Sequence, residues 1–158
     1  MNLIGKPTIH PLLFYTGKLS GYFTWVALLL GYCNVHVVKT TDLLWNRYID
    51  IALMLTGLIL IVVSSFSLGK STRLGLPSEG TVMKTGGLYR LSRNPMYVGF
   101  NLITIASVVY FYNLIILALG IYSILVYHLI ILGEEKFLEN RFGQEYLDYK
   151  RKVKRYWW

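Results

Sequence analysis

The sequence has little of what disulfide-rich, metal-binding or ordinary soluble proteins need. Cysteine occurs once, at Cys33, which excludes a disulfide framework and a cysteine-based metal cluster. We interpret Cys33, within an apolar run, as a small buried residue. Charged residues make up 15% of the 158 residues, against about a quarter in soluble domains. A soluble globular fold, a disordered tail and a secreted scaffold are therefore excluded.

Charge is not only scarce but absent from three long stretches. Residues 19–38, 51–69 and 94–133 contain no Asp, Glu, Lys or Arg, and 54% of the whole chain is hydrophobic. A helix needs about 20 apolar residues to cross the hydrocarbon core of a bilayer. The sequence therefore predicts an integral membrane protein.

The expected fold is an all-α membrane helix bundle in a single domain over residues 1–158. The first two spans are placed at 19–38 and 51–68. The uncharged run 96–133 is long enough for two helices that turn near Tyr112 and Asn113. The apolar residues 11–15 extend the first span or form an interfacial or re-entrant turn. About four spans result, followed by a charged tail over 134–158.

The 16 basic residues test this topology. With four spans, every Lys and Arg except Lys39 and Arg47 lies on one face, and Asp42 and Asp50 offset those two. The positive-inside rule then places both termini in the cytoplasm. No removable signal peptide is expected. Basic residues beside apolar spans meet lipid headgroups, so we expect membrane lipids and no nucleic acid as partners.

The first polar patch, residues 85–99, precedes and enters the third span. Pro95 suits the first turn of a helix and disfavours a helical Asn94. Arg93 and Asn94 are thus predicted at a helix N-terminus, where free N–H groups attract an anion. A carboxylate or phosphate can dock there, with Arg93 as a bidentate partner.

Other residues of this patch have two interpretations. Gly86 and Gly87 permit backbone conformations closed to other residues. Tyr89 and Tyr97 offer rings to a flat or cationic ligand. Alternatively the tyrosines form an aromatic belt, and Arg90 and Arg93 anchor the chain at the lipid headgroups.

The second polar patch is Glu134 and Glu135, directly after the uncharged run. Acidic residues at a cytoplasmic helix end oppose the helix dipole and the positive-inside rule. Their partner is expected to be Arg90, Arg93 or the ammonium group of a ligand. The alternative is a solvated juxtamembrane turn with an internal Glu–Arg pair.

The tail has apolar and aromatic residues at helical intervals and a basic cluster at 150–155. It fits an amphipathic segment on the membrane, interrupted at Gly143, or a basic stop-transfer tail. His128, the one ionisable side chain deep in the last two spans, is a functional candidate or a neutral interhelical hydrogen-bond partner. Gly17 and Gly21 have a spacing that permits close helix packing or arises by chance.

Four elements in the C-terminal half resemble the membrane-embedded methyltransferases that include isoprenylcysteine carboxyl methyltransferase and phospholipid N-methyltransferases. They occur in the family's order, with a helical hairpin between the second and third. The elements are Gly87-Leu88-Tyr89, then Arg93-Asn94-Pro95-Met96-Tyr97-Val98-Gly99, then Glu134-Glu135 with Leu138, and Phe142-Gly143-Gln144-Glu145-Tyr146-Leu147-Asp148-Tyr149. The N-terminal half is similar only as generic membrane helices.

The resemblance implies S-adenosylmethionine as cofactor, in a cytosolic site built from residues 81–99 and 134–149. It carries over as cofactor-binding residues Tyr89, Arg93, Asn94, Pro95, Met96 and Tyr97, with Glu134 or Glu135 opposite. Residues 81–84 match the family poorly. Where many members have histidine, this chain has Asn94, which cannot act as a general base. Arg93, Glu134, Glu135 and His128 are the residues expected to serve catalysis.

The chemistry of the residues agrees with that cofactor. The carboxylate of S-adenosylmethionine can pair with Arg93, and its ammonium group can pair with a glutamate. Its sulfonium can lie against the tyrosine rings. The methyl acceptor is a lipophilic carboxylate, amine or thiol, with isoprenylcysteine-type carboxyl methylation the first expectation. One alternative is an NADPH-dependent membrane reductase, because sterol reductases have a similar Arg-x-Pro-x-Tyr-x-Gly region. The other is a non-enzymatic membrane scaffold. The sequence indicates no obligate protein partner and no metal site.

Overall fold

A computed structural model describes residues 7–35, 37–39, 44–68 and 83–157. Regular structure in these ranges is helical throughout, which confirms the all-α class. The elements are α1 (Pro11–Tyr32), α2 (Leu44–Leu68), the 3-10 helix η2 (Gly87–Arg90), α3 (Pro95–Phe111), α4 (Leu114–Phe142) and α5 (Gln144–Lys152). Asp42, the loop 69–82 with its Thr81 and Val82, and the first six residues lie outside the described ranges.

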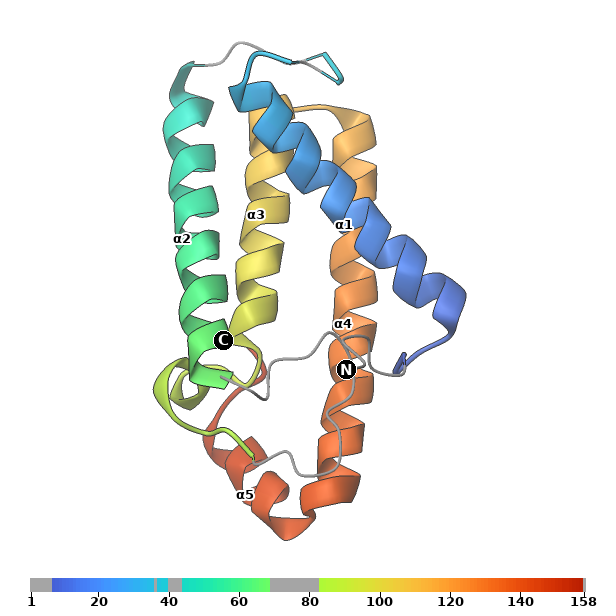
Figure 1. Cartoon of the computed structure of the whole chain (residues 1–158), viewed down its shortest axis with the longest axis vertical. Helices are drawn as coiled ribbons and strands as arrows, with labels where there is room; N and C mark the ends of the chain where they lie inside the picture. The colour runs from blue at the N-terminus through green and yellow to red at the C-terminus, as the bar shows by residue number, and fades with distance from the viewer. Residues whose placement is uncertain (1–6, 36, 40–43, 69–82, 158) are drawn as a thin grey trace.

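The four long helices lie in one bundle, in which α2 packs along α3 and α1 crosses α4 obliquely (Figure 1). The predicted turn near Tyr112 and Asn113 is confirmed, because α3 ends at Phe111 and α4 begins at Leu114. Tyr112 adopts a left-handed conformation with φ 45°. The Asn113 side chain caps α4 by accepting a hydrogen bond from the Ile115 N–H at 2.9 Å. This turn lies at one end of the bundle, and η2 and α5 lie at the other.

The first helix differs from the expectation. It covers Pro11–Tyr32 rather than 19–38, which confirms the alternative that residues 11–15 extend the first helix and excludes a re-entrant turn at those residues. Pro11 begins it, since the first helical N–H groups need no partner. It ends before Asn34, which has a positive φ of 63°. Cys33 therefore lies at an exposed helix end, and its interpretation as a buried residue was wrong.

The last long helix also extends beyond its predicted end. We expected the span to stop at Gly133, but α4 continues for two and a half turns to Phe142. The expected break at Gly143 is confirmed, and this residue has φ 54°. Residues 134–142 contain every Glu, Lys and Arg of the helix, so we treat 114–133 as its membrane segment. Because Glu134 and Glu135 are inside α4 and not at its end, our argument from the helix dipole was wrong.

Glycines set how closely the helices approach. A Cβ atom on Gly57 of α2 would lie 2.7 Å from the Gly99 carbonyl oxygen of α3, and a Cβ on Gly99 would meet the Gly57 oxygen at the same distance. The two backbones are thus in direct contact. Gly17 and Gly21 of α1 are buried against Val126 and Ser123 of α4, so their spacing does serve close packing.

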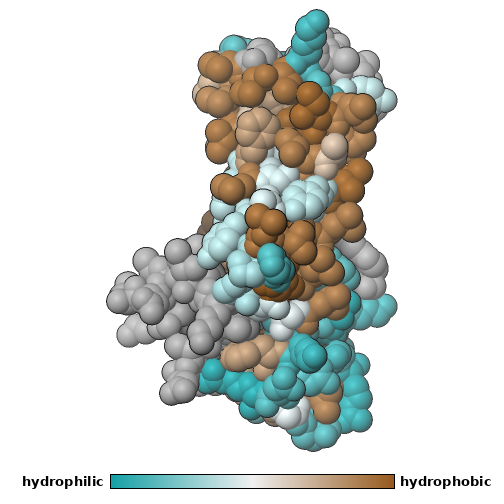
Figure 2. Space-filling model, turned by 90° about the vertical axis from the view of Figure 1, so that its right-hand side faces the viewer, coloured by the Kyte–Doolittle hydropathy of each residue, from teal (hydrophilic) through white to brown (hydrophobic). Residues whose placement is uncertain are grey.

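Among the residues that the structure describes, two helical segments, Arg47–Ser67 and Leu114–Phe142, are long and apolar enough to cross a membrane. Only 22% and 39% of their apolar stretches are buried inside the protein, so most of this apolar surface faces outward. Hydrophobic residues cover much of the upper part of the face in Figure 2, and hydrophilic residues gather at its lower end. Helix α3 is apolar but has 17 residues. Four spans in total stays a prediction.

Candidate functional site

The first polar patch folds as predicted around the start of α3. Pro95 opens the helix, Asn94 is its non-helical N-cap residue, and Met96 follows half-buried in the first turn. Gly87 has φ 60°, a left-handed conformation that favours glycine. Gly86 differs from the expectation, because its φ of −94° and ψ of 170° are open to any residue. The patch therefore places Arg93 and Asn94 at a helix N-terminus.

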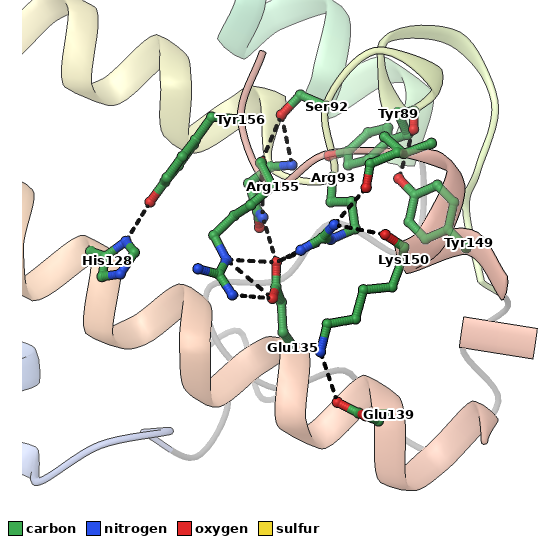
Figure 3. A network of polar contacts seen from close by, with 12 residues as sticks. Tyr89, Ser92, Arg93, His128, Glu135, Glu139, Tyr149, Lys150, Arg155 and Tyr156 are labelled. Carbon is green, nitrogen blue, oxygen red and sulfur yellow. Dashed lines mark hydrogen bonds and ion pairs between the residues drawn. The ribbon is translucent and has the colours of Figure 1, made fainter. Parts of the chain in front are cut away.

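Glu135 joins the two predicted patches through a buried ion cluster (Figure 3). The Arg93 guanidinium donates to Glu135 Oε1 from Nη2 at 2.9 Å and from Nε at 3.2 Å. Arg155, in the C-terminal segment, donates from Nη2 to Glu135 Oε2 at 2.9 Å. The side chains of Arg93 and Glu135 are 7% and 5% exposed, and that of Arg155 is 31% exposed. One carboxylate thus bridges two guanidinium groups.

Residues 153–156, here called the C-terminal strap, are held against the start of α3. The Arg93 N–H donates to the Lys154 carbonyl at 2.9 Å, and Ser92 Oγ donates to the Arg155 carbonyl at 3.0 Å. The amide nitrogen of Asn94 donates to Glu135 Oε1 at 3.2 Å and to the Arg155 carbonyl at 3.3 Å. Both N–H donors of this asparagine are therefore used, which a single ring nitrogen of histidine could not supply.

The surroundings of Glu135 keep it ionised. Burial alone raises the pKa of a carboxyl group. Hydrogen bonds from Arg155 and the charge and hydrogen bonds of Arg93 outweigh that effect and hold the pKa of Glu135 below its ordinary value of 4.5. The hydrogen bonds from Glu135 in turn raise the pKa of Arg155. Glu135 and Arg155 therefore remain charged at neutral pH.

Glu134 points away from this cluster, since consecutive helical residues are about 100° apart. Its Oε1 accepts a hydrogen bond from the Tyr97 hydroxyl at 2.8 Å. The Tyr97 ring lies 5.7 Å from Tyr127 and 6.0 Å from Phe100 in an aromatic cluster that also includes Trp25. The buried hydroxyl of Tyr127 has no partner among the described residues. Glu134 therefore places one carboxylate beside buried aromatic rings.

His128 contacts the strap and not the ion cluster. Its Nδ1 lies 2.8 Å from the Tyr156 hydroxyl, and the two rings are 6.1 Å apart. His128 and Glu135 are seven residues apart on α4, which is about 10 Å along the helix. The strap thus meets α4 at two points two turns apart.

The second half of the tail supports the strap. Tyr149 of α5 donates its hydroxyl to the Tyr89 carbonyl at 2.6 Å, and burial raises the pKa of Tyr149 to about 12, so it remains a donor. Lys150 forms an ion pair with Glu139 of α4 at 3.2 Å. Tyr89, which the sequence predicts as a cofactor-binding residue, is itself buried. The expected amphipathic tail is therefore a short helix that packs on α4 and is hydrogen-bonded to η2 through Tyr149.

Sequence reasoning brought Arg93, Asn94 and Glu135 together but missed Arg155, Ser92 and Tyr156. Arg155 is one of five cations in residues 150–155, a cluster interpreted only as a headgroup contact. Nothing in that run distinguishes the one side chain that turns inward. Arg90, the other partner considered for the glutamates, is exposed.

The comparisons with known proteins agree with this geometry. The sequence model of the family described as phospholipid methyltransferase matches residues 45–145. This match includes α2, η2, α3, α4 and the start of α5. The chain belongs to the phospholipid methyltransferase family, a class of membrane methyltransferases, which confirms the resemblance drawn from the motifs. No curated protein matches the chain.

Proposed function

We propose that the protein transfers the methyl group of S-adenosylmethionine to a lipophilic acceptor that enters from the bilayer. The family assignment supports methyl transfer. The observation that carries the proposal is the meeting of Arg93, Arg155 and Glu135 at the start of α3, while Glu134, the adjacent residue of α4, contacts Tyr97. These residues lie where the charge-free part of α4 ends, a level that both a polar cofactor and a lipid can reach.

The residues present fit this cofactor by their chemistry. Both oxygens of Glu135 are taken by protein donors, whereas Glu134 accepts its described hydrogen bond through Oε1 only. We therefore assign Glu134 to the cofactor's ammonium group and the arginine cluster to its carboxylate. The rings around Tyr97 and Tyr127 suit a sulfonium. Tyr89, Asn94, Pro95 and Met96 remain pocket residues in this proposal.

The bound cofactor supplies a methyl group activated by its sulfonium charge. The chain's own contribution is to orient the cofactor and to exclude water from the site. Arginine and glutamate at fixed positions align the amino-acid part, and the aromatic cluster keeps water from the reacting atoms. His128, held by Tyr156, supports the strap in this arrangement.

Among the acceptors that the sequence leaves open, we propose a phospholipid amine before a prenylcysteine carboxylate. Burial raises the pKa of Glu134 to about 7, so this carboxyl group is negatively charged in part of the molecules at neutral pH. A carboxylate acceptor would be repelled by that charge, whereas an amine would be attracted by it. Exposed cations near the site, among them Lys152 and Lys154, suit the phosphate group of a phospholipid. The order of the two acceptors is the reverse of the sequence-based expectation.

The basic residues also lead us to propose that the site and the C-terminus face the cytoplasm. The strap, α5 and the start of α3 form one end of the bundle. By the positive-inside rule, this end is cytoplasmic.

The test is binding and turnover with purified protein. We expect calorimetry to detect S-adenosylhomocysteine and radiolabelled methyl transfer into phosphatidylethanolamine vesicles. Phosphatidylcholine vesicles are the matched control, because their nitrogen is already fully methylated. A prenylcysteine acceptor in the same assay tests the second candidate, because methyl transfer to it would show a carboxylate acceptor. Absence of any response to S-adenosylmethionine or S-adenosylhomocysteine would overturn the proposal.

Two other functions are tested by the same sample. A nicotinamide-dependent reductase predicts a thermal shift with NADPH and none with S-adenosylmethionine. A scaffold predicts that neither ligand shifts the unfolding temperature and that charge-neutral substitutions of Glu134 have no effect on binding. The family assignment favours methyl transfer over both.

A further inference from the structure

The two arginines that contact Glu135 are in different environments. Arg93 uses all three guanidinium nitrogens on the protein itself. Nε and Nη2 donate to Glu135, and Nη1 donates to the carbonyls of Val153 and Lys150. With a side chain that is 7% exposed, Arg93 has no nitrogen left for a ligand.

Arg155 retains an unused edge. Its Nε and Nη2 donate to Glu135, while Nη1 has no partner among the residues that the structure describes. An arginine has five N–H donors and can hold two carboxylates on two edges. The 31% exposure of the Arg155 side chain leaves its second edge accessible from outside the cluster.

The charge of the cluster also calls for an anion. Arg93 and Arg155 contribute two positive charges, and Glu135 contributes one negative charge. Asp148 and Glu139 are paired with Arg151 and Lys150. The cluster therefore carries one excess positive charge, and its partly exposed member, Arg155, can attract an anion from outside.

The strap holds Arg155 where such an anion would dock. The Arg155 carbonyl accepts hydrogen bonds from Ser92 and Asn94, directly before the first turn of α3 (Figure 3). The free N–H groups of this turn add to the attraction for an anion. The backbone of Arg155 is thus fixed while one edge of its guanidinium stays open.

We propose that Arg155 binds the carboxylate of S-adenosylmethionine and that Arg93 is a positioning residue that acts through Glu135. The inference rests on the proposed function and deepens it. It adds a cofactor residue outside the motifs that carry the family resemblance. It also changes the part that the sequence assigns to Arg93, from direct contact to support of Glu135 and the strap.

The experiment compares S-adenosylmethionine with its decarboxylated form, which keeps the ammonium and the sulfonium but lacks the carboxylate. Affinities are measured by calorimetry on detergent-purified full-length protein. Wild type is expected to prefer the carboxylated ligand by roughly 10- to 100-fold, the worth of a charge-assisted bidentate contact. In Arg155→Gln this preference is expected to fall to about threefold or less, because the carboxylate has lost its partner.

Two variants separate a direct role from a structural one. Lys136→Gln removes an exposed cation of α4 next to Glu135 and should leave the preference unchanged. Arg93→Gln should weaken both ligands together and change their ratio less than Arg155→Gln does. If Arg155→Gln does not fold, Arg155→Lys is compared by the same ratio, which should fall because lysine cannot form the bidentate contact.

The outcomes are distinguishable. Failure of wild type to bind either ligand overturns the proposed function itself. Equal binding of both ligands by wild type, or an unchanged preference in the Arg155 variants, overturns the assignment of Arg155 while the proposed function stands. A preference lost in Arg93→Gln but kept in Arg155→Gln would return the carboxylate contact to Arg93.

Discussion

The Tyr156 hydroxyl lies 2.8 Å from Nδ1 of His128, and this contact ties the end of the chain to the middle of α4. Arg155, the preceding residue, binds Glu135 on the same helix. A segment of adjacent residues is thus fixed at two levels of α4. Because the same segment borders the start of α3, its placement determines the shape of the candidate site.

Replacing Tyr156 with Phe removes the hydrogen bond to His128 and should loosen the strap. The expected loss is about 1 kcal/mol, the usual net worth of one hydrogen bond. Trypsin cleavage after Lys154 or Arg155 should then be roughly fivefold faster than in wild type. Tyr48→Phe, at a tyrosine that is 80% exposed, is the control. Unchanged cleavage would mean that the contact does not hold the strap.

Replacing Glu135 with Ala should destabilise the protein, since Arg93 and Arg155 are left facing each other without a counter-charge. Removal of one partner of a buried ion pair costs about 3–5 kcal/mol. Thermal unfolding in detergent measures the loss. Glu139→Ala, which removes a half-exposed ion pair with Lys150, should cost about 1 kcal/mol or less. Equal effects of the two variants would contradict the buried cluster.

The lowered pKa of Glu135 predicts a dependence of stability on pH. A carboxyl group with a lower pKa in the folded state stabilises the protein fully above its unfolded pKa. That contribution is lost as pH falls below about 4.5 towards the folded pKa. Unfolding temperatures of wild type and Glu135→Gln between pH 3 and 7 test this. The wild-type curve should fall more steeply on the acid side, and parallel curves would refute the prediction.

Replacing Glu134 with Gln should affect binding more than stability. The amide oxygen of Gln can still accept the hydrogen bond from Tyr97, but it carries no charge for an ammonium group. We expect roughly tenfold weaker binding of S-adenosylhomocysteine with a nearly unchanged unfolding temperature. Methylthioadenosine, which lacks the amino-acid part, should bind both proteins alike. If it too is weakened, Glu134 acts on another part of the site.

The contact between Gly57 and Gly99 predicts a large effect of one methyl group. Gly57→Ala places a Cβ atom 2.7 Å from a backbone oxygen, so α2 and α3 must separate. The expected loss is about 1–3 kcal/mol, measured as a lower unfolding temperature. Gly86→Ala is the matched control, because its Cβ meets nothing within 4 Å. A tolerated Gly57→Ala would show that the helices do not touch there.

Cys33 provides a test of orientation. It is exposed at the end of α1, away from the strap and α5. If the termini are cytoplasmic, a membrane-impermeant maleimide should label Cys33 in cells with a permeable outer barrier and an intact inner one. A Cys33→Ser, Lys154→Cys variant should be labelled only after lysis. The reverse pattern would invert the topology.

The features that could be predicted from the sequence depend on residues close together along the chain. The turn at Tyr112 and Asn113 follows from the length of an uncharged run, and the start of α3 follows from the backbone limits of Pro95. Helix ends that depend on packing were misplaced. Helix α1 begins at Pro11 and α4 continues past Gly133, because hydropathy marks where the bilayer ends and not where the helix ends.

The pairing of charges could be predicted only in part. That Glu135 needs a cation was evident from its place after an apolar span. Which cation it meets was decided by the path of the strap.

The sequence by itself determined the helical class, the polar ends of the spans and the motifs that place the chain in its family, because composition and local backbone preference are properties of short segments. Only the tertiary structure decided that Arg93 is buried with a protein partner at each guanidinium nitrogen, while Nη1 of Arg155 has no partner among the described residues. The reason is physical: Glu135 lies 42 residues from Arg93 and 20 from Arg155, and side chains so far apart meet only when the whole bundle has folded.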